Sequence, residues 1–507
     1  MLVKNWEIDE RTDRVEVSAD IDGFRLWYRL PRSSPVSRTG DPFLAAAMLP
    51  AMVRGERLEI DRRLTVSPKL LANLTVLQEI HHSWNPALKI VPISARTSPS
   101  RPLGGGTMSF FSGGVDSAYT FLKHADEIDH LVFIQGFDFY APGGESSIFS
   151  VGDLGDLSQL AHKLTRPADR LSAFIRDGLS GNTRQVLADY FGPRPQPSLL
   201  ESALVEELNR IVAGPSIWEP RRFAGISLRT ETRDLLATKP RDEDRERLNR
   251  LLLEDAFRLE IARARSPIYR EAVDRNTAFA RAFGKTLIPV ATNSFPFGYR
   301  YNLSRNLAQG GVLASIALLL GFPTVYIPAS YSYDKLFPLG SHPLTDPLWA
   351  NEGTEIIHDG SEARRADKIR RIAEDGRALA NLTVCFNDMN VNCGTCLKCL
   401  RTMISLKLLQ AGPGPFPPFP SHAVIKKMSI AGAIEKGFFQ ENLDLALQSE
   451  DAGLREALQA CLRRQERREL LRNVDRVILG GLIKRLSRAV TKGDSGIRRI
   501  DTMARND

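Results

Sequence analysis

The fold is decided by Met108-Ser109-Phe110-Phe111-Ser112-Gly113-Gly114-Val115-Asp116-Ser117, followed by Ala118-Tyr119-Thr120-Phe121-Leu122. The apolar run predicts a strand, the glycines a tight turn, and the last stretch a helix. The first N–H groups of a helix lack intrahelical partners, and the helix dipole favours negative charge there. Strand, glycine turn and helix together therefore predict an anion site, with a tight turn and a simple helix cap as the alternative.

Three more apolar runs follow, at residues 131–134, 287–290 and 324–327, separated by helical stretches. Continuous apolar strands alternating with helices are typical of a parallel sheet covered on both faces. We therefore expect an α/β domain with a doubly wound parallel sheet over residues 101–410. The long stretch between the second and third strands predicts a helical insertion at about residues 144–284.

The flanking regions differ from this pattern. Residues 1–100 combine alternating and helical segments and predict an α+β N-terminal domain. Residues 411–420 contain five prolines and predict a stiff linker, and residues 421–507 predict a basic helical C-terminal region. The chain of 507 residues has a net charge of +8, and residues 462–507 carry 13 Lys and Arg against six Asp and Glu. A solvated helical tail is the favoured interpretation, and nucleic-acid binding through it is the alternative.

Each residue of the glycine turn has an expected part in holding phosphate. The backbone of Gly113, Gly114 and Val115 closes around the anion, and Ser112 and Ser117 add hydroxyl donors. A bare phosphate would repel Asp116, so this carboxylate is expected to act through Mg²⁺ or to orient the loop. The chain contains no Walker A loop and no dinucleotide-binding G-x-G-x-x-G motif.

Four of the five cysteines lie within fifteen residues: Cys385, Cys393, Cys396 and Cys399. Four thiolates with two C-x₂-C spacings can close a tetrahedral Zn²⁺ site, and a site filled by protein ligands is structural. An iron–sulfur cluster and four unrelated buried cysteines are the alternatives.

The turn Ser112-Gly113-Gly114-Val115-Asp116-Ser117 resembles the PP-loop of the ATP pyrophosphatases, which split ATP between its α and β phosphates. The resemblance implies an adenine nucleotide α-hydrolase-like fold. Together, the loop and the cysteine motif resemble the 7-cyano-7-deazaguanine synthase family over residues 108–409. That family converts a deazapurine carboxylate to a nitrile through an adenylate and ammonia. The first hundred residues, the insertion and the basic tail depart from the compact family pattern.

Polar residues follow the later strands and are candidates for the same site. Lys335 and Arg300 are expected to offset phosphate charge, and His342 is a candidate general acid or base. Thr292, Asn293 and Asp138 follow strands, where an open parallel sheet binds its ligands. The alternative makes these side chains surface pairs and turn or helix caps.

These observations predict an adenylating enzyme that uses ATP, Mg²⁺ and Zn²⁺. Its catalytic candidates are Asp116, Ser117, Lys335 and His342. Its partners would be a small carboxylate, such as a 7-deazaguanine carboxylate, and ammonia or an amine, with a protein as another acceptor. A tRNA-modifying enzyme of the PP-loop type and a non-catalytic ATP-binding scaffold are the alternatives.

Composition and the N-terminus predict where the protein acts. Residues 1–7 lack a basic start followed by an apolar stretch, and no apolar run reaches the ~20 residues needed to cross a bilayer. Few cysteines fit a reducing compartment. We therefore expect a cytoplasmic protein that does not span a membrane, and a homodimer is compatible with the sequence.

Overall fold

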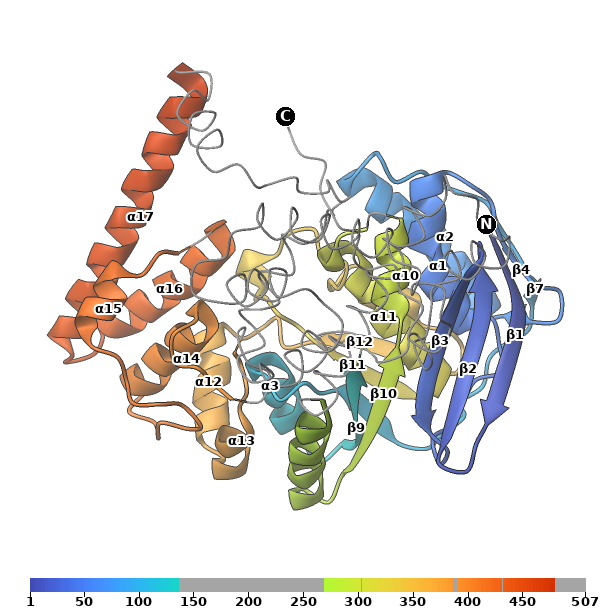
Figure 1. The fold of residues 1–507 in the computed structure, drawn as a ribbon, viewed down its shortest axis with the longest axis horizontal. Helices are drawn as coiled ribbons and strands as arrows, with labels where there is room; N and C mark the ends of the chain where they lie inside the picture. The colour runs from blue at the N-terminus through green and yellow to red at the C-terminus, as the bar shows by residue number, and fades with distance from the viewer. Residues whose placement is uncertain (136–268, 302, 386–390, 431, 479–507) are drawn as a thin grey trace, which may run out of the picture.

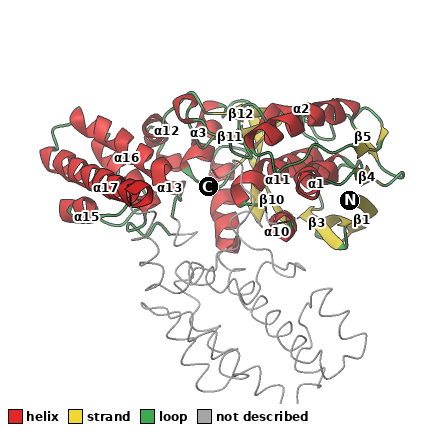
Figure 2. Ribbon diagram, turned by 90° about the horizontal axis from the view of Figure 1, so that it is seen from above, coloured by secondary structure: helices red, strands yellow, loops and turns green. Residues whose placement is uncertain are grey.

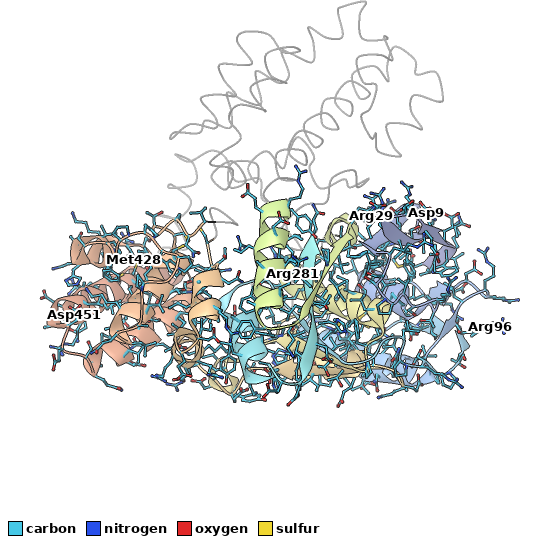
Figure 3. The ribbon with its side chains drawn as sticks, turned by 90° about the horizontal axis from the view of Figure 1, so that it is seen from below. Asp9, Arg29, Arg96, Arg281, Met428 and Asp451 are labelled. Carbon is cyan, nitrogen blue, oxygen red and sulfur yellow. The ribbon has the colours of Figure 1, made fainter. Side chains whose placement is uncertain are left out.

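A computed structural model describes residues 1–135, 269–301, 303–385, 391–430 and 432–478. One mostly parallel sheet of ten strands runs through it, in the order β12-β11-β8-β9-β10-β3-β2-β1-β4-β6. The molecule is elongated, with the N-terminal strands at one end and the C-terminal helices at the other (Figure 1). In Figure 3, Asp9 and Arg29 mark the first end, Arg281 the middle, and Met428 and Asp451 the second end. The fold is therefore α/β, as the sequence predicts.

The parallel part of the sheet contains the four predicted strands and a fifth. Its strands are β8 (Thr107–Phe110), β9 (Ile128–Gln135), β10 (Thr286–Thr292), β11 (Thr324–Pro328) and β12 (Glu355–Asp359). In this parallel part, β8 comes first in the sequence and β9 and β10 follow on one side of it. The chain then crosses back and places β11 and β12 on the other side of β8. The strand order therefore reverses between β8 and β11. In such sheets, ligands bind outside the carboxyl ends of the strands at this reversal.

The two faces of this sheet enter different cores, because alternate side chains of a strand point to opposite faces. Met108, Val132 and Val325 belong to the larger core, which includes α1 (Asp41–Arg54) and α11 (Arg305–Leu320). Leu131 and Tyr326 belong to a second core on the other face. That core includes α3 (Val115–Lys123), α12 (Arg365–Ala373), α13 (Gly376–Asn381) and α14 (Leu397–Leu408). Helices thus cover both faces, compatible with a doubly wound sheet, and Figure 2 shows the strands between them.

The N-terminal residues continue the same sheet. Their strands are β1 (Leu2–Glu10), β2 (Arg14–Ile21), β3 (Phe24–Pro31), β4 (Leu58–Ile60) and β6 (Ile93–Ser94). The strand β3 pairs antiparallel with β10, and N-terminal side chains share the larger core with β8 and β11. The helix α2 (Pro68–Trp84) begins at Ser67, whose hydroxyl accepts a bond from the N–H of Leu70. The boundary expected near residue 100 therefore does not separate two sheets.

The prolines of residues 411–420 and the helices behind them pack on the rest of the chain. The Pro-rich stretch forms no helix or strand, and Phe416 and Phe419 pack against the core beneath α14. Three helices follow: α15 (His422–Lys427), α16 (Gly432–Leu447) and α17 (Ala452–Ile478). They share a third core with Ile404 of α14. The predicted C-terminal helices are therefore present as far as residue 478.

Some predictions concern parts of the chain outside the described residues. Most of the insertion expected at 144–284 lies there, and its end, residues 269–282, is helical. Asp138 and residues 479–507 of the basic tail lie there as well. Among the helices that the structure describes, none combines the length and the apolar character needed to cross a bilayer.

Candidate active site and metal centre

The turn between β8 and α3 is closed by its own serines. The backbone N–H of Ser112 donates to Ser117 Oγ at 3.2 Å, and Ser117 Oγ donates to the Gly114 carbonyl at 3.1 Å. Gly113 has a φ of +78°, which favours glycine, and its carbonyl accepts a 2.8 Å bond from the N–H of Thr383. The N-cap residue Gly114 offers no side chain to the helix N–H groups. The first turn of α3 therefore keeps donors for a ligand, at the reversal between β8 and β11.

Asp116, in the first turn of α3, faces two cations of α12. Its Oδ1 lies 3.2 Å from Lys368 Nζ, and its Oδ2 lies 3.5 Å from Arg365 Nη1. Lys368 also donates to the Ala329 carbonyl at 2.6 Å, just beyond the end of β11. Burial favours the neutral carboxyl, but the charges of Lys368 and Arg365 outweigh it and lower the pKa of Asp116. Asp116 is therefore an ionised carboxylate that links the loop to α12.

A third cation, Arg401 of α14, completes this group. Its Nη1 donates to both carboxylate oxygens of Glu435, at 3.0 and 2.9 Å. Its guanidinium carbon lies 4.0 Å from the ring centre of Phe438, and that of Arg365 lies 5.5 Å from the same ring. Burial and the charge of Arg365 lower the pKa of Arg401 to about 10, so it remains protonated at neutral pH. We call Arg365, Lys368 and Arg401 the cation group.

Tyr331, three residues beyond β11, joins the cation group. Its ring stacks on Phe438 with centres 6.0 Å apart. Burial and the nearby charge of Asp116 raise the pKa of the Tyr331 hydroxyl. The carboxyl ends of β8 and β11 thus bring together the glycine loop, an aromatic stack and three buried or nearly buried cations.

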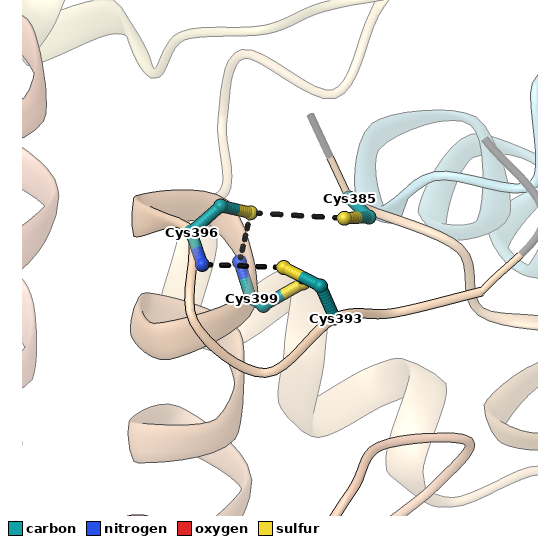
Figure 4. Close-up of side chains that lie close together, drawn as sticks. All are labelled: Cys385, Cys393, Cys396 and Cys399. Atoms are coloured by element: carbon teal, nitrogen blue, oxygen red, sulfur yellow. Dashed lines mark hydrogen bonds between the residues drawn. The ribbon is translucent and has the colours of Figure 1, made fainter. Parts of the chain in front are cut away.

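The four predicted cysteines meet in space (Figure 4). Their sulfurs lie within 4.8 Å of one another, with 3.9 Å between Cys385 and Cys396 and 4.0 Å between Cys393 and Cys399. Sulfurs of a tetrahedral zinc site, with metal–sulfur distances of about 2.3 Å, are about 3.8 Å apart. The four thiols therefore fit a metal ion such as Zn²⁺.

The cysteine cluster connects two segments that reach the candidate site. Cys385 lies two residues beyond Thr383, which bonds the glycine loop, and Cys399 lies two residues before Arg401. Gly394, with a φ of +70°, turns the chain between the ligands and packs under Pro417 of the Pro-rich stretch. A metal at this cluster would hold α14 to residues 383–385. It would thereby also hold Arg401, which lies on α14, close to the glycine loop, which is bonded to Thr383.

Lys335 points to the C-terminal helices. It forms a short ion pair with the buried Glu441 of α16 and contacts the carbonyl of Gly437. The 3₁₀ turn that carries it, η5 (Tyr333–Lys335), is fixed by a bond from Ser332 to Asp334. Lys335 thus joins the end of β11 to α16, and among the described residues its partners belong to α16 and not to the glycine loop.

His342 lies in a separate cluster, packed against α2. Its ring meets that of Trp84 edge to face at 5.3 Å, and its Nδ1 accepts from the N–H of Leu344. Nearby, Asp346 accepts bonds from Ser341 Oγ and His358 Nδ1, both at 2.7 Å. Burial and the proximity of His358 lower the pKa of His342. These contacts place His342 beside α2, on the face of the sheet that carries the larger core. Its contacts do not include residues 112–117.

The junction between β10 and β3 is held by bonds from three predicted site residues: Thr292, Asn293 and Arg300. Asn293 accepts from the N–H of Trp27 at 2.9 Å and donates to the Arg25 carbonyl at 2.8 Å. Thr292 bonds the hydroxyl of Ser294, and Arg300 donates to the carbonyl of Asp22. Since β9 separates β10 from β8, the structure does not bring these three side chains to the glycine loop.

The sequence patterns do not predict the cation group. Arg365 and Lys368 lie in the first turn of α12, where the helix dipole disfavours cations. A basic start to a helix behind a strand is the signal that could have identified them. The strand itself, β12, was not predicted, and Arg401 carries no signal beyond its place after Cys399, the last cysteine of the motif.

Comparison with known proteins yields no match. The chain matches no family model, no curated protein and no solved structure.

Proposed function

We propose that the chain is an adenylating enzyme of the PP-loop type that cleaves ATP to AMP and pyrophosphate. One observation carries the proposal: the Ser112–Ser117 loop lies at the strand reversal, beside Asp116 and the cation group. Helix N-termini and fixed cations stabilise charge that develops on phosphate oxygens. These groups support the proposal that the site holds a nucleoside triphosphate and its leaving pyrophosphate.

In the proposed reaction, a carboxylate oxygen of the substrate attacks the α-phosphorus of ATP. The bond from that phosphorus to the oxygen shared with the β phosphate breaks, and pyrophosphate leaves with the electron pair. The acyl adenylate then reacts with ammonia or an amine, and AMP leaves. Asp116 is the carboxylate in the loop that would hold Mg²⁺, which neutralises phosphate charge when bound.

The resemblance of the two motifs to the 7-cyano-7-deazaguanine synthases supports a 7-deazaguanine carboxylate as the substrate. The four close thiols support Zn²⁺ in a structural position, since the protein supplies all four ligands. The proposed partners are the carboxylate and ammonia or an amine.

The test is pyrophosphate release from Mg²⁺-ATP by the full-length protein, with and without 7-carboxy-7-deazaguanine. We expect release that depends on the carboxylate and falls at least a hundredfold in Asp116→Asn. Asp126→Asn is the matched control, because Asp126 is exposed and belongs to the turn after α3. ATP binding without pyrophosphate release under any of these conditions would contradict the proposal.

A further inference from the structure

We propose that Arg365 and Arg401, with Lys368, form a polyphosphate site that binds the two phosphates leaving as pyrophosphate. The inference deepens the proposed function and rests on it, because it assigns the far side of the same site to the leaving group. It adds three residues that neither the loop motif nor the cysteine motif includes.

Unused hydrogen-bond donors are the first argument. A guanidinium carries five N–H donors. In the described part of the chain, Nε of Arg365 and Nε of Arg401 are both buried without a hydrogen-bond partner. Towards the described residues, Arg365 donates from Nη1, at a long 3.5 Å to Asp116, and Arg401 donates from Nη1 to Glu435. Buried donors without acceptors are costly, so these two side chains are arranged for an acceptor that the described residues do not supply.

The charges favour an anion at the same place. Three cations that are at most 9% exposed face two carboxylates, Asp116 and Glu435, beside the N-terminus of α3. Arg365 and Lys368 also occupy the first turn of α12, where they do not stabilise their own helix. A surplus of buried positive charge next to a helix N-terminus is offset when a multiply charged anion binds.

One aromatic ring contacts both guanidinium groups. Phe438 lies under the guanidinium groups of both arginines, with 4.0 Å to Arg401 and 5.5 Å to Arg365. Tyr331 stacks on Phe438 in turn. Ordered, planar guanidinium groups suit bidentate contacts with phosphate. Three cations and the loop N–H groups offer more donors than a single carboxylate can accept, so the geometry points to a polyphosphate.

The experiment is a calorimetric titration of the full-length protein with inorganic pyrophosphate in the absence of Mg²⁺. We expect saturable binding that weakens at least tenfold in Arg365→Met and severalfold in Arg401→Lys, which keeps the charge but loses the planar fork. Arg370→Met is the control on the same helix, because Arg370 is exposed and pairs with Asp367. The control should bind pyrophosphate within twofold of the original protein.

Two results would overturn the inference: no saturable binding of pyrophosphate to the original protein, or affinities of both variants within twofold of it. Circular dichroism checks that each variant is folded. If Arg365→Met does not fold, Arg365→Lys retains a buried charge and should still weaken binding severalfold.

Asp116→Asn separates this inference from the proposed function. Without Mg²⁺, removal of the carboxylate charge frees Arg365 and Lys368, so pyrophosphate should bind at least as tightly as before. The same variant should lose ATP cleavage. Pyrophosphate binding that depends on the arginines without any ATP cleavage would uphold the inference and refute the proposed enzyme. Cleavage of ATP, together with pyrophosphate binding that does not depend on the arginines, would uphold the proposed enzyme and refute the inference.

Discussion

Asp116 is the residue at which the loop, α3 and α12 meet. Its sequence neighbours predict a carboxylate in a phosphate loop. Its contacts add that Arg365 and Lys368 hold it from 249 and 252 residues further along the chain. A carboxylate that keeps two cations in place also limits their repulsion before a ligand binds. The residue therefore has a structural task in addition to the proposed one.

Gly113→Ala tests the conformation of the loop. The substitution places a Cβ 3.1 Å from Asn276 Oδ1 at a φ of +78°. We expect the free energy of unfolding to fall by about 1–2 kcal/mol, with loss of ATP binding, measured by urea denaturation and nucleotide titration. Gly23→Ala is the control, because Gly23 has a φ of +73° but open space around its Cα. An equal loss of ATP binding in both variants would contradict the role of the loop.

His81 makes the stability of the protein depend on pH. The ring is 1% exposed, neither nitrogen has a partner among the described residues, and burial lowers its pKa to about 4. An unfolded chain binds the proton near pH 6.5, so the stability from neutral His81 is complete above that pH and is lost as the pH falls towards 4. The loss amounts to about 3 kcal/mol over this window.

His81→Phe keeps a ring against Trp84, which meets His81 edge to face, and removes the titration. Urea denaturation at several pH values from 7 to 4 should show a smaller loss of stability in the variant. If the free energy of unfolding falls equally with pH in the two proteins, His81 is not the source of the pH dependence.

Site residues could be predicted where the members of a site are close together in the sequence. The loop residues 112–117 and the four cysteines are adjacent in sequence, so their spacing alone predicts a site. Asn293 was expected near the nucleotide because it follows a strand, and His342 as a general acid or base, but each has its partners elsewhere. Partners 266 residues apart, such as Asn293 and Trp27, leave no trace in local spacing.

At the scale of elements, the cysteine cluster joins α14 to the segment that bonds the loop. The four cysteines form no disulfide in the described part of the chain, so a metal would supply a cross-link between these segments. We therefore expect a metal at the cysteine cluster to stabilise the candidate active site without being part of it.

Cys396→Ser should lower the zinc content from one equivalent per chain to a small fraction, because three thiolates and a hydroxyl bind the ion weakly. Hydrogen exchange should then become faster in α14 and at residues 383–385, while β2 and β3 keep their protection. Cys461→Ser is the control, since Cys461 is buried in the C-terminal core and lies outside the cluster. Full zinc content in Cys396→Ser would contradict the site.

Elements were predictable where hydrophobic periodicity is strong. The runs at 131–134, 287–290 and 324–327 fall on strands of the sheet, and the run at 108–111 falls on β8 except for Phe111. The strand β12, Glu355-Ile356-Ile357-His358-Asp359, was missed because its ends are charged and its core holds only two aliphatic residues. The acidic residue at its end is nevertheless buried and paired, since Asp359 pairs with Lys123 and His124.

At the scale of the whole molecule, the N-terminal strands and the parallel strands form a single sheet with a common core. Sequence periodicity predicted both sets of strands but not their union, because the pairing of β3 with β10 joins residues more than 250 positions apart. We expect residues 1–100 and the parallel sheet to unfold together.

Asn293→Ala tests this union. Loss of the side chain leaves the N–H of Trp27 and the carbonyl of Arg25 without their partner at the junction. We expect a fall of about 1–3 kcal/mol in the free energy of unfolding, with the transition of the sheet remaining cooperative. Asn306→Ala is the control, because Asn306 is an exposed helical residue. Separate melting of the N-terminal strands, detected by hydrogen exchange, would contradict a shared sheet.

The most direct test of the proposed adenylation is the exchange of labelled pyrophosphate into ATP. With Mg²⁺-ATP, 7-carboxy-7-deazaguanine and no amine, a reversible adenylate should carry label into ATP. The exchange should require the carboxylate and disappear in Asp116→Asn. Cleavage of ATP to ADP and phosphate, or bound ATP without any exchange, would contradict the account.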